Sequence, residues 1–364
     1  MAETHLGTQP STRHSDLTLP NIGLRWLVLT ALLVVVFMAT LAVGSVTIPL
    51  EDIVSVLAGG EASKASWTTI VLQFRLPKAV TAVLVGAALA ASGLMMQTLF
   101  RNPLAGPFVL GISSGASLGV ALVVLSVGTV GGTLLAGISL FSDLSLAASA
   151  MIGAGLVLML VLLIARKIAD SMTLLVLGVM IGFMTNALVS LLMFFSIPEQ
   201  IQAFINWTFG SFSGVTWSEL RILAPAVIVG LLITVWLVKP LNALLLGPAY
   251  ARSLGLNVAR TRFWIVLATA ILAGVVTAFA GPIGFLGIAV PHLCRSLFGT
   301  SDHKALVPAV MLVGAIVALV AAIIAEVPGS SLILPLNAVM AVIGAPVVIA
   351  VILRRRNLDR SFAA

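Results

Sequence analysis

The sequence predicts an all-α polytopic membrane protein with about ten transmembrane helices. Of its 364 residues, 60% are apolar and 9% are charged, whereas a soluble domain carries roughly a quarter charged residues. The mean hydropathy is +1.20. Uncharged stretches long enough to cross a bilayer, which needs about 20 apolar residues, recur along the chain.

The two ends of the chain are polar, and the transmembrane domain lies between them. Residues 1–24 carry Ser, Thr and Pro and are expected to be a disordered cytoplasmic tail. Residues 354–364 form a basic cytoplasmic tail. The first apolar run is too long for a signal-peptide core, so we expect it to be retained. Within the domain 25–353 the predicted spans are 25–45, 78–100, 108–127, 147–165, 172–195, 222–238, 262–280, 283–298, 305–325 and 335–353.

Proline and glycine set two of these boundaries. The uncharged run 263–294 is too long for one helix, and Gly281-Pro282 divides it. Pro107 opens a new helix after the loop 101–106. Both breaks carry Ala-Gly-Pro before an apolar segment, a weak echo of the inverted repeats that are common in transporters.

The distribution of basic residues predicts the orientation. With the N-terminus inside, fifteen of the nineteen Lys and Arg residues are cytoplasmic. Because cytoplasmic loops carry the excess of Lys and Arg, both termini are predicted to be cytoplasmic. The remaining four, predicted outside, are Lys64, Arg75, Lys78 and Arg221. The net charge of +7 is therefore explained by topology, and no nucleic-acid partner is expected.

The longest basic connection, residues 239–262, is predicted to be a cytoplasmic surface. It contains two short runs, 241–246 and 250–256, separated by Gly247-Pro248. This pattern predicts two small helices joined by a turn. A plain connection between spans needs only a few residues, so this one is long enough to bind a partner.

Few residues suit covalent chemistry or metal binding. The single cysteine, Cys294, excludes an internal disulfide and a Cys-based metal site. His292 and His303 are expected to pack or to make hydrogen bonds at interfaces rather than to bind a metal. No HExxH motif, paired Asp or Ser/His arrangement occurs within the spans, which disfavours an intramembrane enzyme. We expect no catalytic residue, no metal and no cofactor bound by this chain.

The predicted spans contain almost no acidic residues. Ion-coupled carriers place a carboxylate or an unwound polar site near the middle of the membrane. A secondary transporter is therefore the disfavoured alternative, and energy is expected to enter through the loop 239–262.

Two further segments are functional candidates. Arg75 and Lys78 stand three residues apart on one helical face, which suits docking of an acidic external partner, although basic residues beside a membrane are common. The small-residue segments 86–104 and 106–119 suit tight helix packing. Their uncharged polar residues suit the wall of a translocation path: Gln97, Asn102, Pro103, Ser113 and Ser114.

Several ordered motifs resemble one family. RLPK, GAALAASG, RNPLAGP, LGISSGA, the loop LNALLLG with ARSLG, GPIGFLGIAVPHLCR and a late GAP run in order from about Leu72 to Leu353. They resemble the FecCD-type permeases of type II ABC importers, which serve iron–siderophore, haem and cobalamin uptake. The resemblance implies a ten-helix, multi-pass subunit in the bacterial inner membrane.

The resemblance also implies partners and roles. The expected partners are a second permease subunit, two cytoplasmic ATPases that bind ATP and magnesium, an external substrate-binding protein and membrane lipid. The cytoplasmic gate falls on Asp170, Ser171, Met172 and Thr173, and the docking contacts fall on Arg75 and Lys78. The ATPase-coupling loop falls on Leu241, Leu246, Gly247, Pro248, Ala251, Arg252, Ser253, Leu254 and Gly255.

The chain departs from the family pattern at its predicted outer end. Ala322 and Glu326 stand where the family has Asp and Arg, and Ile333 stands where it has Glu. Glu326 would then reverse the sign of a third docking cation. Because like charges disfavour docking, this reversal indicates either a different second permease subunit that keeps the usual Arg or a binding protein with a matching basic residue. The three departures taken together slightly favour the different subunit. The expected cargo is an iron(III)–siderophore, with haem or cobalamin as alternatives.

Overall fold

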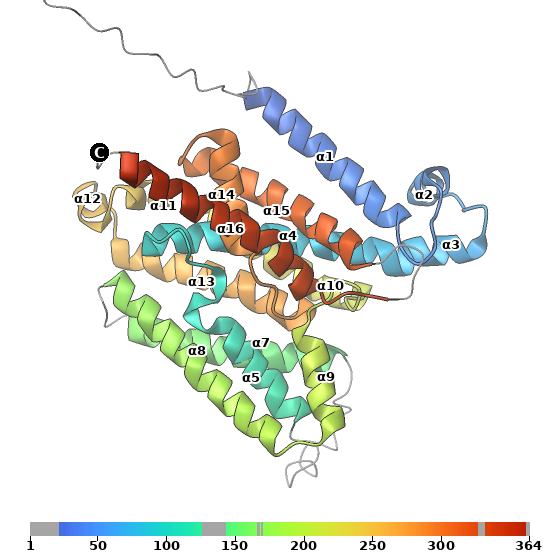
Figure 1. Ribbon diagram of the computed structural model, residues 1–364, viewed down its shortest axis with the longest axis horizontal. Helices are drawn as coiled ribbons and strands as arrows, with labels where there is room; N and C mark the ends of the chain where they lie inside the picture. Colours follow the sequence, from blue (N-terminus) through green and yellow to red (C-terminus); the bar gives the residue numbers. More distant parts are fainter. Residues whose placement is uncertain (1–21, 126–142, 166–167, 169, 327–331, 362–364) are drawn as a thin grey trace, which may run out of the picture.

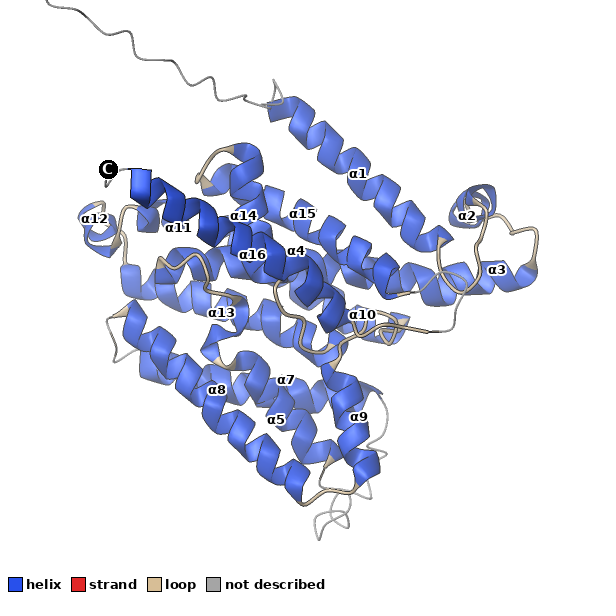
Figure 2. Ribbon diagram, viewed as in Figure 1, coloured by secondary structure: helices blue, strands red, loops and turns tan. Residues whose placement is uncertain are grey.

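The computed structural model describes residues 22–125, 143–165, 168, 170–326 and 332–361, and these are almost entirely helical (Figure 2). The helices, labelled as in Figure 1, are α1 (Ile22–Ala42), α2 (Leu50–Leu57), α3 (Ala65–Thr69), α4 (Leu76–Phe100), α5 (Ile112–Val124), α7 (Asp143–Ala165), α8 (Ser171–Phe194), α9 (Pro198–Thr208), α10 (Trp217–Trp236), α11 (Val238–Leu245), α12 (Pro248–Ser253), α13 (Val258–Ala280), α14 (Leu286–Phe298), α15 (His303–Ala325) and α16 (Leu336–Ser361), with a π-helical turn at Ile70–Arg75 and a 3₁₀ turn at Pro107–Leu110.

Each of the ten predicted spans overlaps a helix, so the all-α prediction is confirmed. Residues 126 and 127 of the third predicted span lie outside the described residues. Among the described residues, seven helices are long and apolar enough to cross a membrane, and three shorter apolar helices accompany them. The prediction missed the short helices α2 and α9, which lie outside the long apolar runs that guided it. Most of the predicted N-terminal tail, residues 1–21, lies outside the described residues, as do 362–364 of the C-terminal tail.

The span predicted to begin at Lys78 begins earlier. Its helix runs without interruption from Ala65 to Phe100. Proline at a first turn predicted a helix start near Pro77, because proline has no N–H to donate. The structure instead continues through Pro77, with the π-helical turn Ile70–Arg75 immediately before it. Such turns are rare and occur often at functional sites.

Helix α4 is the centre of the bundle. Of its 25 residues, 21 are buried, and it packs against α10, α13, α14 and α15. A Cβ added to Gly86 would overlap the Gly314 carbonyl of α15, and one added to Gly93 would overlap the Gly287 carbonyl of α14. Small residues thus let backbones touch, which confirms tight packing as their role.

The first Ala-Gly-Pro break packs against α14, the helix that follows the second break. A Cβ on Gly287 of α14 would lie 2.6 Å from Cδ of Pro107. Gly111 and Gly281 take positive φ values of 75° and 76°, which glycine adopts without a Cβ penalty. The predicted division at Gly281-Pro282 is confirmed.

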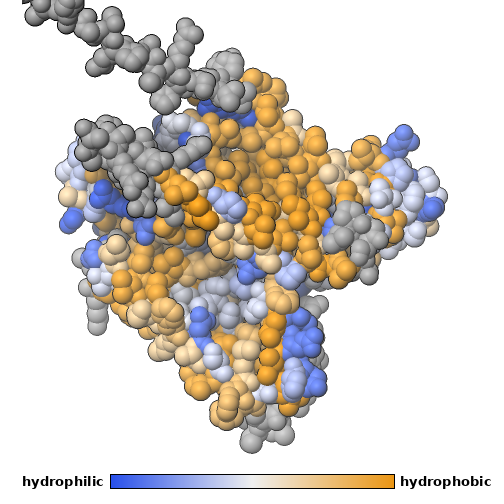
Figure 3. Space-filling model, viewed as in Figure 1, coloured by the Kyte–Doolittle hydropathy of each residue, from blue (hydrophilic) through white to orange (hydrophobic). Residues whose placement is uncertain are grey.

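Helices α5, α7 and α8 form a second group, which lies below α13 in Figure 1. Close contact between Gly115 of α5 and Gly153 of α7 holds two of these helices together. Much of the surface seen in Figure 3 is apolar, as expected for a chain that faces lipid. Exposed Leu, Val, Met and Phe side chains lie along α1 and α8.

The bundle has two ends, which we name by their short helices. The loop end holds α11 and α12, and the hairpin end holds α2 and α3 (Figure 1). Helix α1 begins near the C-terminal end of α14, because Nη1 of Arg25 donates to the Leu297 carbonyl (2.8 Å) and the Trp26 and Phe298 rings are 4.9 Å apart. Helix α16 runs back toward the loop end (Figure 1). The described chain therefore begins and ends toward the loop end.

Candidate functional site

The predicted coupling loop is two short helices, as its sequence pattern indicated. Helix α11 ends at Leu245, Gly247 turns the chain with φ of 100°, and α12 begins at Pro248. Only glycine adopts that φ readily, and proline suits a first helical position. Asn257 then caps α13, since its Oδ1 accepts from the Arg260 N–H (3.0 Å).

The loop divides into an anchoring face and an exposed face. Leu241 and Ala251 are fully buried inside the subunit. Leu246, Tyr250 and Leu254 are exposed, Leu254 by 60%. Ala251 is therefore a core residue of this chain and is not available as a contact, whereas Leu254 is. The other predicted coupling residues lie in or beside α12: Pro248, Arg252, Ser253 and Gly255.

The predicted gate is a tight turn into α8. Asp170 is the N-cap of α8, where its Oδ2 accepts from the Thr173 N–H and the Thr173 hydroxyl, both at 2.8 Å. The backbone hydrogen bond from Thr173 is the main cause that lowers the Asp170 pKa below its ordinary value. Met172 is exposed. An N-cap carboxylate satisfies N–H groups that the helix leaves without partners.

Arg262 joins the loop to the gate. Its Nη1 donates to the Ile168 carbonyl (2.6 Å) in the turn that precedes α8. A cavity of about 1160 Å³ lies between the two regions, and its lining includes Arg101, Asp170, Arg252 and Arg262. The structure thus brings together two segments that are far apart in the sequence. Arg166, Lys167 and residue 169 of this turn lie outside the described residues.

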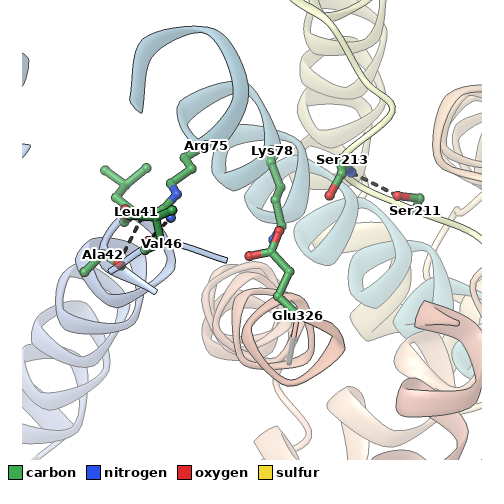
Figure 4. Close-up of polar contacts among 8 residues, drawn as sticks. All are labelled: Leu41, Ala42, Val46, Arg75, Lys78, Ser211, Ser213 and Glu326. Atoms are coloured by element: carbon green, nitrogen blue, oxygen red, sulfur yellow. Dashed lines mark hydrogen bonds and ion pairs between the residues drawn. The ribbon is translucent and has the colours of Figure 1, made fainter. Parts of the chain in front are cut away.

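The predicted docking cation Arg75 is enclosed by its own chain. It is 6% exposed, and its Nη1 donates to the carbonyls of Leu41 (2.7 Å) and Ala42 (3.0 Å), while Nη2 donates to that of Val46 (Figure 4). The Leu41 and Ala42 carbonyls lie at the end of α1, where a helix leaves C=O groups without partners, and Val46 lies in the loop that follows. Arg75 therefore caps α1 rather than standing free.

Lys78 is also buried and paired within the subunit. It is 5% exposed, and its Nζ lies 2.5 Å from Oε1 of Glu326, with which it forms an ion pair (Figure 4). The expected surface patch of two free cations is not present in this structure. Glu326 does not present a lone negative charge either, because Lys78 neutralises it.

The residues expected along a path are packed into the subunit to different degrees. Gln97 is 4% exposed: its Nε2 donates to the Ile288 carbonyl (3.2 Å), and its Oε1 accepts from Arg295 (2.6 Å). It therefore links α4 to α14 and does not line an open wall. Asn102 and Pro103 form the turn after α4, and Ser113 and Ser114 are half-buried in α5.

Both singled-out histidines make interfacial hydrogen bonds, as predicted. His292 Nε2 bonds to the Pro103 carbonyl (2.9 Å), and His303 bonds to Thr98 and Asn242 (both 2.8 Å). In the part of the chain that the structure describes, no three His, Cys, Asp or Glu side chains group closely enough for a metal. Thr98 and Asn242 were missed, because a lone Thr and a lone Asn carry no sequence signal.

Comparison with known proteins places this architecture in a family. The profile of the FecCD transport family matches residues 32–354, nearly the whole chain. The chain belongs to the FecCD transport family. It is 39% identical to the vitamin B12 import system permease protein BtuC of Klebsiella pneumoniae, over 92% of this chain and 95% of that protein. The BtuC protein of Citrobacter koseri is 37% identical over 83% of this chain and 88% of its own.

Solved structures agree with this FecCD assignment. A putative metal-chelate type ABC transporter in an inward-facing conformation has a TM-score of 0.79 and 29% identity, over 91% of this chain and 99% of that chain. PsaBC of Streptococcus pneumoniae, with a TM-score of 0.52 and 17% identity over 76% of this chain and 90% of that chain, shares the fold alone. The chain is thus an ABC importer permease of the FecCD type, a multi-pass protein of the bacterial cytoplasmic membrane.

Proposed function

We propose that this FecCD permease moves a metal chelate into the cell by ATP-driven alternating access, and that cobalamin is its cargo. The observation that carries the proposal is the 39% identity to a vitamin B12 permease across 92% of the chain. The family resemblance favoured an iron(III)–siderophore within the same class of chelates, and haem is the third candidate. Each is a large ligand that carries its own metal.

The position of the buried carboxylate in the spanning helices supports ATP, rather than an ion gradient, as the energy source. Among the described spanning helices, the buried carboxylate Glu219 lies in the first turn of α10, where it accepts from the N–H and the hydroxyl of Thr216. It serves as a helix cap near the end of a span. Ion-coupled carriers use carboxylates nearer the middle of the membrane, so we assign the energy input to separate ATPase subunits that hold ATP and magnesium.

We place the ATPase contact on the exposed face of the coupling loop, at Leu246, Tyr250 and Leu254. This assignment makes the loop end cytoplasmic, in agreement with the excess of basic residues in cytoplasmic loops. A push on α12 then reaches α13 and, through Arg262, the turn before α8. Asp170, Ser171, Met172 and Thr173 would open or close the inner end of the path as that turn shifts.

The substrate-binding protein would dock at the hairpin end. Arg75 and Lys78 support this end indirectly, because they fix α1 and α15 to the start of α4. Direct charge contacts would come from the exposed side chains there, which include Glu51, Glu61 and Lys64. A second permease subunit would complete the path.

The test is transport by the reconstituted complex. The chain is purified with its ATPase, placed in liposomes with its binding protein, and offered radiolabelled cyanocobalamin, ferric ferrichrome or haemin. We expect ATP-dependent accumulation of cyanocobalamin. Accumulation of ferrichrome or haemin in its place would replace the cargo but keep the transporter class. Uptake driven by a proton or sodium gradient without ATP would refute the class.

A further inference from the structure

We infer that Asn242, His303 and Thr98 form a polar relay that transmits movement of the coupling helix α11 to the central helix α4. The inference rests on the proposed function, because it requires that an ATPase moves the loop. The three residues come from three elements, α11, α15 and α4, which pack against one another at the loop end. They act as positioning residues, since none of them is assigned a contact with cargo.

Asn242 joins α11 to the start of α15 through both ends of its amide. Its Oδ1 accepts from the His303 N–H (2.8 Å), the first N–H of α15, and its Nδ2 donates to Oδ1 of Asp302 (2.6 Å). The first N–H groups of a helix have no partner within it. Because one end of the amide faces a donor and the other an acceptor, its orientation is determined.

His303 extends the connection to α4. Its imidazole is fully buried, with Nδ1 at 2.8 Å from Oδ1 of Asn242 and Nε2 at 2.8 Å from Oγ1 of Thr98. The Asn242 oxygen can only accept, so Nδ1 carries a proton. In the neutral ring Nε2 then accepts from the Thr98 hydroxyl. One side chain thus spans the gap between α11 and α4.

Neither helix needs this connection to form. Helix α15 has its own N-cap, because Oδ1 of Asp302 accepts from the Lys304 N–H (2.9 Å). The single proton of the Thr98 hydroxyl has an alternative acceptor within α4, the Leu94 carbonyl at 2.9 Å. Several other buried threonines bond only within their own helix: Thr277, for example, donates to the Ala273 carbonyl (2.7 Å). The His303–Thr98 bond is therefore a contact between helices that α4 does not need for its own structure.

The position of Thr98 explains why such a contact transmits movement. It lies in the last turn of α4, two residues before the helix ends at Phe100. The glycine contacts of α4 with α15 and α14 lie earlier in the helix, at Gly86 and Gly93, so the His303 bond is a separate polar link at the last turn of α4. Packed interiors transmit strain because their compressibility is low. A displacement of α11 that pulls His303 is therefore passed to the last turn of α4 at Thr98.

The experiment follows nucleotide-dependent amide hydrogen exchange in the purified transporter with its ATPase, with and without ATP and vanadate. The test variants are Asn242→Ala and Thr98→Val. Thr98→Ser keeps the hydroxyl and should rescue. Two matched controls are Asn257→Ala, which removes an asparagine cap in the same loop, and Thr277→Val, which removes a buried hydroxyl that bonds only within its helix.

In the unmodified complex, nucleotide should change exchange in α11, at the start of α15 and in residues 94–104 around Thr98. In Asn242→Ala and Thr98→Val, the response of α11 should persist. The equilibrium constant for the accompanying change at 94–104 should fall by about tenfold, the factor that a lost buried hydrogen bond represents. Thr98→Ser and both controls should respond like the unmodified complex.

A full response at 94–104 in Thr98→Val would overturn the relay. So would a Thr98→Val complex that only melts at a lower temperature while keeping that response, because the bond would then be structural. An unmodified complex that binds its ATPase but shows no nucleotide response at 94–104 would overturn it too. Failure of any ATPase to co-purify is a different outcome: it refutes the proposed function, and the relay with it.

Discussion

Two basic residues at the hairpin end, Arg75 and Lys78, are buried although basic residues beside a membrane are usually exposed. Basic residues beside a membrane are normally solvated, so Arg75 and Lys78 suggested an open docking patch. Both side chains are buried in the structure. Arg75 donates to carbonyl groups at the end of α1, and Lys78 forms an ion pair with Glu326. A buried charge is costly unless it is paired, which is why Glu326 belongs with Lys78 rather than with an external partner.

This ion pair makes a prediction about stability. Lys78→Met leaves Glu326 partly buried without its cation, and we expect it to cost about 2 kcal/mol, less than a fully buried pair because Glu326 retains 23% exposure. The double variant Lys78→Met/Glu326→Gln should recover most of that loss. The measurement is the melting temperature of the purified protein. Equal melting temperatures for the single variant and the unmodified protein would show that the pair contributes nothing.

A second prediction concerns the glycines that pack α4. In Gly93→Ala the new methyl group would overlap the Gly287 carbonyl, so the two helices must separate. We expect a loss of more than about 3 kcal/mol, above the usual cost of overpacking, seen as a collapse in folded yield. Gly155→Ala is the control, because a Cβ there meets no heavy atom within 4 Å. Normal yield of Gly93→Ala would contradict the packing described for α4.

At the scale of elements, the coupling loop shows how one short segment can both anchor itself and present a surface. Helix α12 begins at a glycine–proline turn, which directs Ala251 inward and leaves Leu254 outside. Ala251 lies within α12, and Leu254 is the C-cap residue that follows the helix. The same substitution at the two positions should therefore have different effects.

Leu254→Asp is expected to abolish ATPase binding while the protein still inserts and folds. Its charge would be buried without a partner only when the ATPase docks, which costs several kcal/mol. Ala251→Asp places the charge in the core of the subunit and should prevent folding itself. Co-purification of the ATPase and size-exclusion profiles distinguish the two results. Retention of the ATPase by Leu254→Asp would exclude α12 as the contact.

The turn before α8 carries a prediction about the gate. Asp170→Ala removes the N-cap and should loosen the start of α8, whereas Asp170→Asn keeps a good cap. Cysteines introduced at Met172 in two permease subunits should crosslink in the closed state, with less dependence on nucleotide in Asp170→Ala than in Asp170→Asn. Identical crosslinking in both variants would show that the Asp170 cap does not affect movement of the gate. A pair of cysteines introduced at Ser171 in the two permease subunits tests the same gate.

The Asp170 cap also has a defined pH dependence. Its pKa is lowered in the folded protein, so its stabilising effect is complete above the ordinary value of 3.8 and is lost as the pH falls through the lower folded value. No effect on the gate is therefore expected between neutral pH and about pH 5.

At the scale of the whole molecule, orientation is decided by thiol labelling. Ser301→Cys at the loop end should react with an impermeant maleimide only after the cells are permeabilised, and Glu61→Cys at the hairpin end should react in intact cells. The native Cys294 is buried and gives little background. The reverse pattern would invert the topology and remove the loop from the cytoplasmic ATPase.

The pairing of permease subunits also belongs to this scale. Glu326 as a lone charge favoured two different subunits, but Lys78 neutralises it, so that reason does not hold. Nothing in the described chain opposes a symmetric pair, and two copies of one chain are the commonest kind of dimer. Native mass spectrometry of the purified transporter decides between the two arrangements.

The sequence by itself determined the membrane class, the approximate positions of the ten apolar helices and the two-helix form of the loop. Each of these depends on local properties: the length of an apolar run, the breaks at Gly281-Pro282 and Gly247-Pro248, and the absence of a proline N–H. Such properties act within a few residues, so they can be predicted without knowing what packs nearby. The family motifs are similarly readable, because they are runs of neighbouring residues.

Only the tertiary structure decided what the polar side chains do. Gln97 was expected on a path and instead joins α4 to α14, and Lys78 meets a carboxylate that lies 248 positions later in the chain. Thr98, Asn242 and His303 come from three separate segments and have no shared pattern in the sequence. The partner of a buried polar group is determined by how the helices pack across the bundle. The neighbouring residues in the sequence therefore do not predict it.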